Sequence, residues 1–236
     1  KRKHKKMKFT SSCVLAVATA ASLSCKVNAQ EFSVNAGGDQ NFATGSYSTI
    51  NGGVSNLALA DFTSIGGGED NIITNDFFDI DSIGSTIVGG QGNQIDGSKS
   101  STIVGGQRNT IFGGDSSSIG GGLTNKISSQ KKKKDKKPEF CTLIGGSGNK
   151  IDKGGATLGG GEDNSSSGQT SFIGGGTDNV ATGNAATVPG GQANKATGSQ
   201  AIALGKDSFA KDKNSFVVNL NGSGKELKSN GAGYVI

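Results

Sequence analysis

The chain has 236 residues, 41 of them Gly, and its hydrophobic content is only 32%. This composition excludes an ordinary globular core and leaves either a glycine-rich linker or a repeat fold with Gly at its turns. Seven of the 24 basic residues lie in residues 1–29, which contain no acidic residue, so residues 30–236 hold 17 basic and 19 acidic side chains. With that balance, a basic face for nucleic acid is not expected.

Residues 1–29 are predicted to be a leader and signal peptide. An apolar stretch at residues 9–24 follows basic residues, and Val27-Asn28-Ala29 places small residues at the −3 and −1 positions of a signal peptidase site. Lipoprotein cleavage before Cys25 is the alternative, although Ser22 is a poor residue for its −3 position. The expected localisation is extracellular or at the cell surface. Cleavage after Ala29 leaves Cys141 alone, so no internal disulfide is expected.

Residues 30–220 are predicted to form one repeat domain. The motif Gly-Gly-x-x-Asn recurs at intervals of mostly 15 or 16 residues, and Ser208 takes the Asn place in an eleventh unit. The repeated Asn residues are Asn41, Asn56, Asn71, Asn93, Asn109, Asn125, Asn149, Asn164, Asn179 and Asn194.

Each unit has two apolar positions, one before the Gly-Gly pair and one after the Asn. The first set is Ile50, Ile65, Ile87, Ile103, Ile119, Leu143, Leu158, Ile173, Val188 and Ile202. The second set is Ala43, Ala58, Ile73, Ile95, Ile111, Ile127, Ile151, Ala181, Ala196 and Ala210, with Ser166 as the polar exception. Two short strands per unit, with these residues and the Asn pointing inward, predict an all-β parallel roll of about eleven coils.

Two longer units indicate loop inserts at residues 75–81 and 130–140. The Gly-Gly side has a fixed length and the opposite side varies, so both inserts are expected to leave the same edge of the roll. The first insert contains Phe77 and Phe78, and the second contains a run of lysines, so both are candidates for partner binding. The lysines are Lys131, Lys132, Lys133, Lys134, Lys136 and Lys137. Residues 221–236 are expected to be a C-terminal tail.

Catalytic groups are scarce in this sequence. The single His is His4, within the predicted leader, so Cys141 has no His partner for nucleophilic catalysis. The Gly-rich turns lack the Lys-Ser/Thr of a phosphate-binding loop, and their acidic residues do not follow the nine-residue period of calcium-binding repeats. We therefore expect no enzymatic activity, cofactor or metal.

The stretch "GSQAIALGKDSFAKDKNSFVV" (residues 198–218) resembles the YadA-like head repeat of trimeric autotransporter adhesins. Ile202, Leu204 and Gly205 match the first part of that pattern, and Ser208 and Ala210 match the second. The resemblance implies a left-handed parallel β-roll, a homotrimer and an adhesive role. Most units here are longer than the family's 14 residues, and no neck, stalk or membrane-barrel pattern follows Phe216, so membrane anchoring is not carried over.

The leading expectation is a secreted or cell-surface adhesive module that attaches to a matrix, a glycan or another polyanionic surface. The alternative is a solenoid that binds ice or polysaccharide through outward residues including Thr49, Ser64, Thr86, Thr102, Ser118, Thr142, Thr157 and Thr187. Phe172 and Ala201 are expected to interrupt that column. Val88, Val104 and Ile144 should form an outward apolar stripe, which favours packing against other copies. No membrane span is expected.

Overall fold

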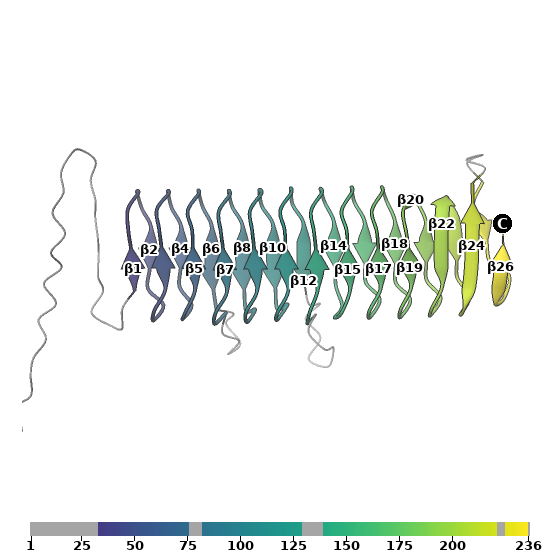
Figure 1. Cartoon of the computed structure of the whole chain (residues 1–236), viewed down its shortest axis with the longest axis horizontal. Coiled ribbons are helices and arrows are strands. Elements are labelled where there is room, and N and C mark those ends of the chain that lie inside the picture. Colours follow the sequence, from purple (N-terminus) through teal and green to yellow (C-terminus); the bar gives the residue numbers. More distant parts are fainter. Residues whose placement is uncertain (1–32, 76–81, 129–138, 221–224, 236) are drawn as a thin grey trace, which may run out of the picture.

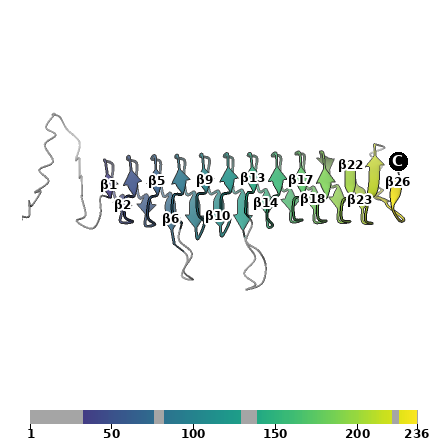
Figure 2. The same ribbon diagram turned by 60° about the horizontal axis from the view of Figure 1, so that its bottom comes forward.

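The computed structural model describes residues 33–75, 82–128, 139–220 and 225–235, and these form a straight rod of stacked coils (Figure 1). The predicted leader and signal peptide lie outside the described residues. Every strand pair is parallel, and each coil gives one strand to each of two sheets, as the sequence predicted. Figure 2 shows the two sheets as separate rows of strands along the rod.

The first strand of each coil belongs to sheet A. Its main path consists of β1 (Val34–Asn35), β3 (Thr49–Ile50), β5 (Ser64–Ile65), β7 (Thr86–Ile87), β9 (Thr102–Ile103), β11 (Ser118–Ile119), β13 (Thr142–Leu143), β15 (Thr157–Leu158), β17 (Phe172–Ile173), β19 (Thr187–Val188), β22 (Ile202–Lys206), β24 (Ser215–Asn219) and β26 (Gly233–Val235), and β20 (Gly191–Gln192) pairs with β22. 

The second strand of each coil belongs to sheet B. Its strands are β2 (Phe42–Ala43), β4 (Leu57–Ala58), β6 (Ile72–Thr74), β8 (Gln94–Asp96), β10 (Thr110–Phe112), β12 (Lys126–Ser128), β14 (Lys150–Ile151), β16 (Ser165–Ser166), β18 (Val180–Ala181), β21 (Lys195–Ala196), β23 (Ser208–Ala210) and β25 (Leu227–Lys228). Twelve strands in this sheet correspond to about twelve coils, one more than expected.

The core is a thin apolar layer between the two sheets. Because side chains alternate along a strand, Thr102 of β9 points outward and is half-buried, whereas Ile103 is fully buried. Ile103 stacks on Ile119 in the next coil, and Ile111 of the facing sheet stacks on Ile127. The predicted inward positions are therefore confirmed across most of the roll. Ser166 interrupts the second column, and its Oγ lies 2.7 Å from that of Ser171.

A ladder of buried Asn side chains joins the coils, as predicted. In the coil of Asn109, Nδ2 donates to the Gly105 carbonyl and to the Gly122 carbonyl of the next coil, both at 3.0 Å. Its Oδ1 accepts the backbone N–H of Asn125 at 3.0 Å. The amide therefore satisfies backbone groups that a turn inside the roll would otherwise leave buried and unpaired.

The second Gly of each pair is required by close contact between coils. Gly106 has φ of 84°, and a Cβ there would lie 2.2 Å from the Gly122 carbonyl oxygen. No side chain fits at that distance, so successive coils stack closely only if this position is Gly. Beside it, Gly105 has nothing within 4 Å of a Cβ, so the first Gly is not held by the same contact.

The sequence assignment was wrong in the coil of Ile202. Thr187 pairs with Ile202 while Gly191 pairs with Gly205, so the stretch leading to the glycine is one residue shorter in this coil. As a result Ala203, and not Ile202, is fully buried in the core column. Ala201 is also buried, so Ile202 takes the outward place in which Ala201 was expected.

The roll also extends into the segment expected to be a tail. β25 pairs with β23, and β26 pairs with β24, so residues 225–235 continue both sheets. Ser229 and Asp212 hold this end together, because the Asp212 carboxylate accepts both Ser229 Oγ and the Gly231 N–H at 2.8 Å. These two hydrogen bonds favour the charged carboxylate and so lower the pKa of Asp212. The bond from the Gly231 N–H is the larger cause, and the bond from Ser229 Oγ is the second.

Candidate functional site

The edge that carries both inserts is the first candidate surface. We call the turns from a sheet B strand to the next sheet A strand the insert edge, and the opposite turns the Gly-Gly edge. The first insert joins β6 to β7 and the second joins β12 to β13, so both leave the insert edge, as predicted. The predicted partner-binding residues Phe77, Phe78, Lys131, Lys132, Lys133, Lys134, Lys136 and Lys137 lie outside the described residues.

Hydrogen bonds close the base of the first insert. The Oδ1 atom of Asn75 accepts the Ser82 N–H at 2.8 Å, and Ser82 Oγ donates to the Thr74 carbonyl at 2.6 Å. Ser82 is fully buried, so the strands on either side of the insert keep the register of the roll.

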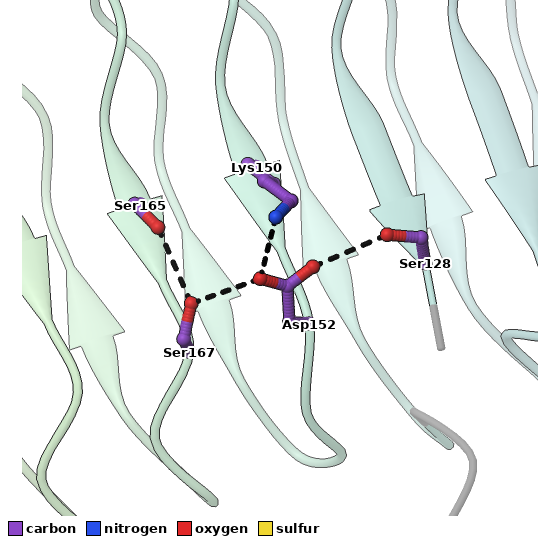
Figure 3. A network of polar contacts seen from close by, with 5 residues as sticks. All are labelled: Ser128, Lys150, Asp152, Ser165 and Ser167. Carbon is purple, nitrogen blue, oxygen red and sulfur yellow. Dashed lines mark hydrogen bonds and ion pairs between the residues drawn. The ribbon is translucent and has the colours of Figure 1, made fainter. Parts of the chain in front are cut away.

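Asp152 anchors the strand end at the second insert (Figure 3). Its Oδ1 accepts Ser128 Oγ at 3.1 Å, and its Oδ2 accepts Ser167 Oγ at 3.1 Å and pairs with Lys150 Nζ at 2.8 Å. Ser165 Oγ lies 3.2 Å from Ser167 Oγ and completes the network across three strands. Asp152 is thus committed to structural contacts, and the network holds Lys150 on the outer face of sheet B.

Three aromatic residues on the insert edge were not singled out from the sequence. Tyr47, Phe62 and Phe140 are 47%, 57% and 70% exposed and have φ of 57°, 56° and 57°. The Tyr47 and Phe62 rings stack with centroids 5.0 Å apart. A left-handed conformation costs a bulky L-residue roughly 1–2 kcal/mol. The same position in the other coils holds Gly84, Ser100, Ser116, Gly155, Thr170, Ala185, Gln200 and Asn214.

These aromatic residues therefore occupy a turn position that does not require a ring, since the other coils fill it with Gly or with small or polar residues. Each combines an unfavourable backbone conformation with a ring exposed to solvent, and smaller residues serve the same turn elsewhere. Strain and exposure of this kind favour a role in contact with a partner. Their position within the repeat unit was the sequence signal, since it is otherwise held by small or polar residues.

The outer face of sheet A, which we call face A, has two outward columns of side chains, and neither column contains a charged residue. Its strand column contains Val34, Thr49, Ser64, Thr86, Thr102, Ser118, Thr142, Thr157, Phe172, Thr187, Ile202 and Phe216. The adjoining column contains Ala36, Asn51, Gly66, Val88, Val104, Gly120, Ile144, Gly159, Gly174, Pro189, Leu204 and Val218. The hydroxyl residues run unbroken from Thr49 to Thr157, and Phe172, 41% exposed, follows them.

The predicted apolar stripe lies on face A. Val88, Val104 and Ile144 are 54%, 52% and 62% exposed, and they stand in neighbouring coils with Gly120 between Val104 and Ile144. The outward orientation expected from the sequence is thus observed. An uncharged face with exposed branched side chains is typical of a surface that packs against something else.

Cys141 takes the place of Ser in a buried column at the end of the second insert. It lies between Ser117 and Ala156 in successive coils, its exposure is 1%, and its Sγ lies 3.2 Å from the Lys153 carbonyl oxygen. Burial raises the pKa of the thiol. A buried thiol with a raised pKa is a packing residue and a poor nucleophile.

Within the described ranges no group of three or more His, Cys, Asp or Glu side chains is placed to hold a metal ion. The same residues form no helix that is long and apolar enough to cross a membrane. No family model and no curated protein sequence matches the chain. The fold and its surfaces are therefore the basis for the proposals that follow.

Proposed function

We propose that this chain is a secreted or cell-surface attachment module, a non-enzymatic β-roll that contacts a surface, a matrix or a glycan through its insert edge. The observation that carries the proposal is the exposure of Tyr47, Phe62 and Phe140 in left-handed backbone positions on the edge that also carries both inserts. The rod presents these groups on a rigid scaffold, as binding loops are presented in many folds.

A binding array tests this function. Residues 30–236 are labelled and applied to matrix proteins, neutral glycans and acidic polysaccharides, beside the double variant Tyr47→Ser, Phe62→Ser. We expect the double variant to lose most binding, because Ser is an ordinary occupant of this turn position and preserves the coil. The matched control is Val54→Ser with Leu123→Ser, which removes side chains 44% and 41% exposed on the Gly-Gly edge. Equal binding by the aromatic variant and the wild-type chain would contradict the proposal.

The oligomeric state proposed for the module is a homotrimer that packs through face A. The resemblance to trimeric adhesin heads implies this assembly, and the uncharged face with Val88, Val104 and Ile144 supports it independently. Packing through face A leaves the insert edge of every copy available to a partner. Sedimentation equilibrium should show a trimer that Val104→Asp dissociates, whereas a monomeric wild-type chain at micromolar concentration would remove this part of the proposal.

One observation favours the alternative function, binding of ice or polysaccharide by face A. The hydroxyl column from Thr49 to Thr157 is continuous and straight, and its β-branched Thr side chains are stiff. The two uses of face A exclude each other. If the chain is monomeric and shows thermal hysteresis that Thr102→Asp abolishes, the alternative replaces the trimer; if it is trimeric, the alternative fails.

A further inference from the structure

The outer face of sheet B, which we call face B, differs from face A in its charge and changes character along the rod. Its first strands place Phe42, Leu57 and Ile72 outward in neighbouring coils. From β12 onward the same column carries four lysines. They are Lys126, Lys150, Lys195 and Lys228.

The cations form one line across the strands of sheet B. Lys126 pairs in register with Lys150, and Lys195 is separated from Lys228 only by Phe209. From β12 to β25 the line crosses seven strands of the sheet order, which at about 4.8 Å per coil is a span of roughly 29 Å. Lys211 adds an exposed ammonium group beside the line.

Phe209 orders two of these cations. The ammonium groups of Lys195 and Lys228 lie 6.0 Å and 5.7 Å from the centroid of its ring, within the range of cation–π attraction. Glu226 lies beside them, 2.9 Å from Lys228 and 3.9 Å from Lys195. One carboxylate therefore pairs with two ammonium groups, and the cluster of Lys195, Lys228 and Glu226 retains a positive charge.

The acidic groups on this half of face B, Asp152 and Glu226, cancel only part of the charge of the four lysines. The Asp152 side chain is only 9% exposed, and its oxygens are bound by Ser128, Ser167 and Lys150. The carboxylates of Glu162, Asp163, Asp178 and Asp207 lie on the Gly-Gly edge, away from the lysine line. A linear polyanion is thus attracted to face B and repelled from the Gly-Gly edge.

We propose that the basic half of face B, from β12 to β25, binds a linear acidic polysaccharide that runs along the rod. A sugar residue and one coil are of similar length, so carboxylate or sulfate groups on a repeating chain can lie opposite the four strands that carry a lysine, β12, β14, β21 and β25. Ser165, Val180 and Thr182 lie between the two lysine pairs, and hydroxyl groups there supply hydrogen bonds suited to sugars. This inference deepens the attachment function proposed above and rests on it, since it names the class of surface.

Other polyanions fit this face less well. An anionic membrane favours apolar side chains that insert among lipids, whereas the apolar residues of this half, Val180 and Phe209, are half-buried. Nucleic-acid surfaces generally use Arg or stacked aromatic rings, and the line contains only Lys, with its single ring placed between two of them.

Dextran sulfate, with neutral dextran of equal length as the control ligand, tests the proposal by biolayer interferometry. We expect the chain to bind dextran sulfate, to ignore dextran, and to bind more weakly as salt is raised. In the variant Lys126→Gln, Lys150→Gln, Lys195→Gln, Lys228→Gln, binding should weaken by about tenfold or more because the line loses its charge. The second insert stays intact in every protein, so its lysines contribute equally.

A matched charge control separates face B from net charge. The variant Lys99→Gln, Arg108→Gln, Lys206→Gln, Lys213→Gln removes four exposed cations that lie outside the lysine line and should bind dextran sulfate within about twofold of the wild-type chain. Circular dichroism confirms that each variant keeps its sheets. Unchanged binding in the fourfold variant, equal loss in the control, or equal affinity for phosphatidylserine vesicles or duplex DNA would overturn the proposal.

Two combinations of results separate a failure of the face B inference from a failure of the attachment function. If the fourfold variant loses dextran sulfate while Tyr47→Ser, Phe62→Ser leaves attachment unchanged, the insert edge is the wrong surface and face B stands. If the aromatic variant loses attachment and the fourfold variant binds dextran sulfate normally, the attachment function stands and the inference about face B fails.

Discussion

Replacing one ladder residue tests how the roll is held together. In Asn109→Ala, two backbone groups lose the only partner that the described structure gives them, the Asn125 N–H and the Gly105 carbonyl. Two other partners of the Asn109 side chain keep a hydrogen bond. The Gly122 carbonyl still accepts the Gln107 N–H, and Asn93 Oδ1 still accepts the backbone N–H of residue 109. An unsatisfied buried group costs about 1–3 kcal/mol, so the loss of two predicts a destabilisation of roughly 2–6 kcal/mol.

Serine at the same position is the matched comparison, because the roll already contains one. Ser208 Oγ donates to the Leu204 carbonyl at 2.7 Å and accepts the Asn219 N–H at 3.0 Å. These two contacts are equivalent to the ones that Asn109→Ala would remove in its own coil. Asn109→Ser should therefore restore partners to both orphaned groups and cost no more than about 2 kcal/mol.

Urea unfolding followed by circular dichroism measures the difference between the two variants. Because repeat proteins can unravel locally, native-state hydrogen exchange at the Asn125 amide should be recorded as well. We expect fast exchange at that amide in the Ala variant and protection in the Ser variant. Equal destabilisation by Ala and Ser, or unchanged exchange at Asn125 in the Ala variant, would show that the Asn side chain does not hold these backbone groups.

Three further predictions follow from the core, the turns and the C-terminal end. Ile103→Ala should cost about 2–5 kcal/mol in urea unfolding, whereas Ile202→Ala, on the outer face, should cost under about 1 kcal/mol, and equal costs would contradict the corrected register. Gly106→Ala should prevent close stacking and lower Tm sharply, whereas Gly105→Ala should change it little; a tolerated Gly106→Ala would show that the coils can move apart. Since the folded pKa of Asp212 is lowered, its stabilisation is present above the ordinary Asp pKa and lost as pH falls through the folded value; exchange at the Gly231 amide should rise in acid, and Asp212→Asn should remove that dependence.

Much of the fold was predictable because the repeat constrains each coil twice. The Gly-Gly-x-x-Asn spacing located one turn, and the apolar positions on either side fixed which residues point inward, as Ile103 and Ile111 show. The assignment failed at Ile202, because counting back from Gly205 assumed a connection of constant length. The connection is one residue shorter in that coil, and a shift of one residue moves every side chain of the strand to the opposite face of the sheet.

The candidate surfaces were less predictable, because they depend on side chains brought together from distant coils. The outward stripe of Val88 and Val104 followed from strand alternation alone. The insert edge was expected, but the stacked Tyr47 and Phe62 were missed, because their signal appears only when the same turn position is compared across all the repeat units. The Lys195 and Lys228 pair requires the twelfth coil, which the sequence placed in a tail.

Tyrosine fluorescence tests most directly whether the insert edge is the contact surface. The chain has no Trp and two Tyr, so in a Tyr234→Phe background the emission comes from Tyr47 alone. We predict that the ligand selected on the binding array changes the Tyr47 emission saturably, with the same midpoint as binding. Phe62→Ser should weaken both the binding and the change in emission. Saturated binding with unchanged Tyr47 emission would show that the insert edge is not the contact surface.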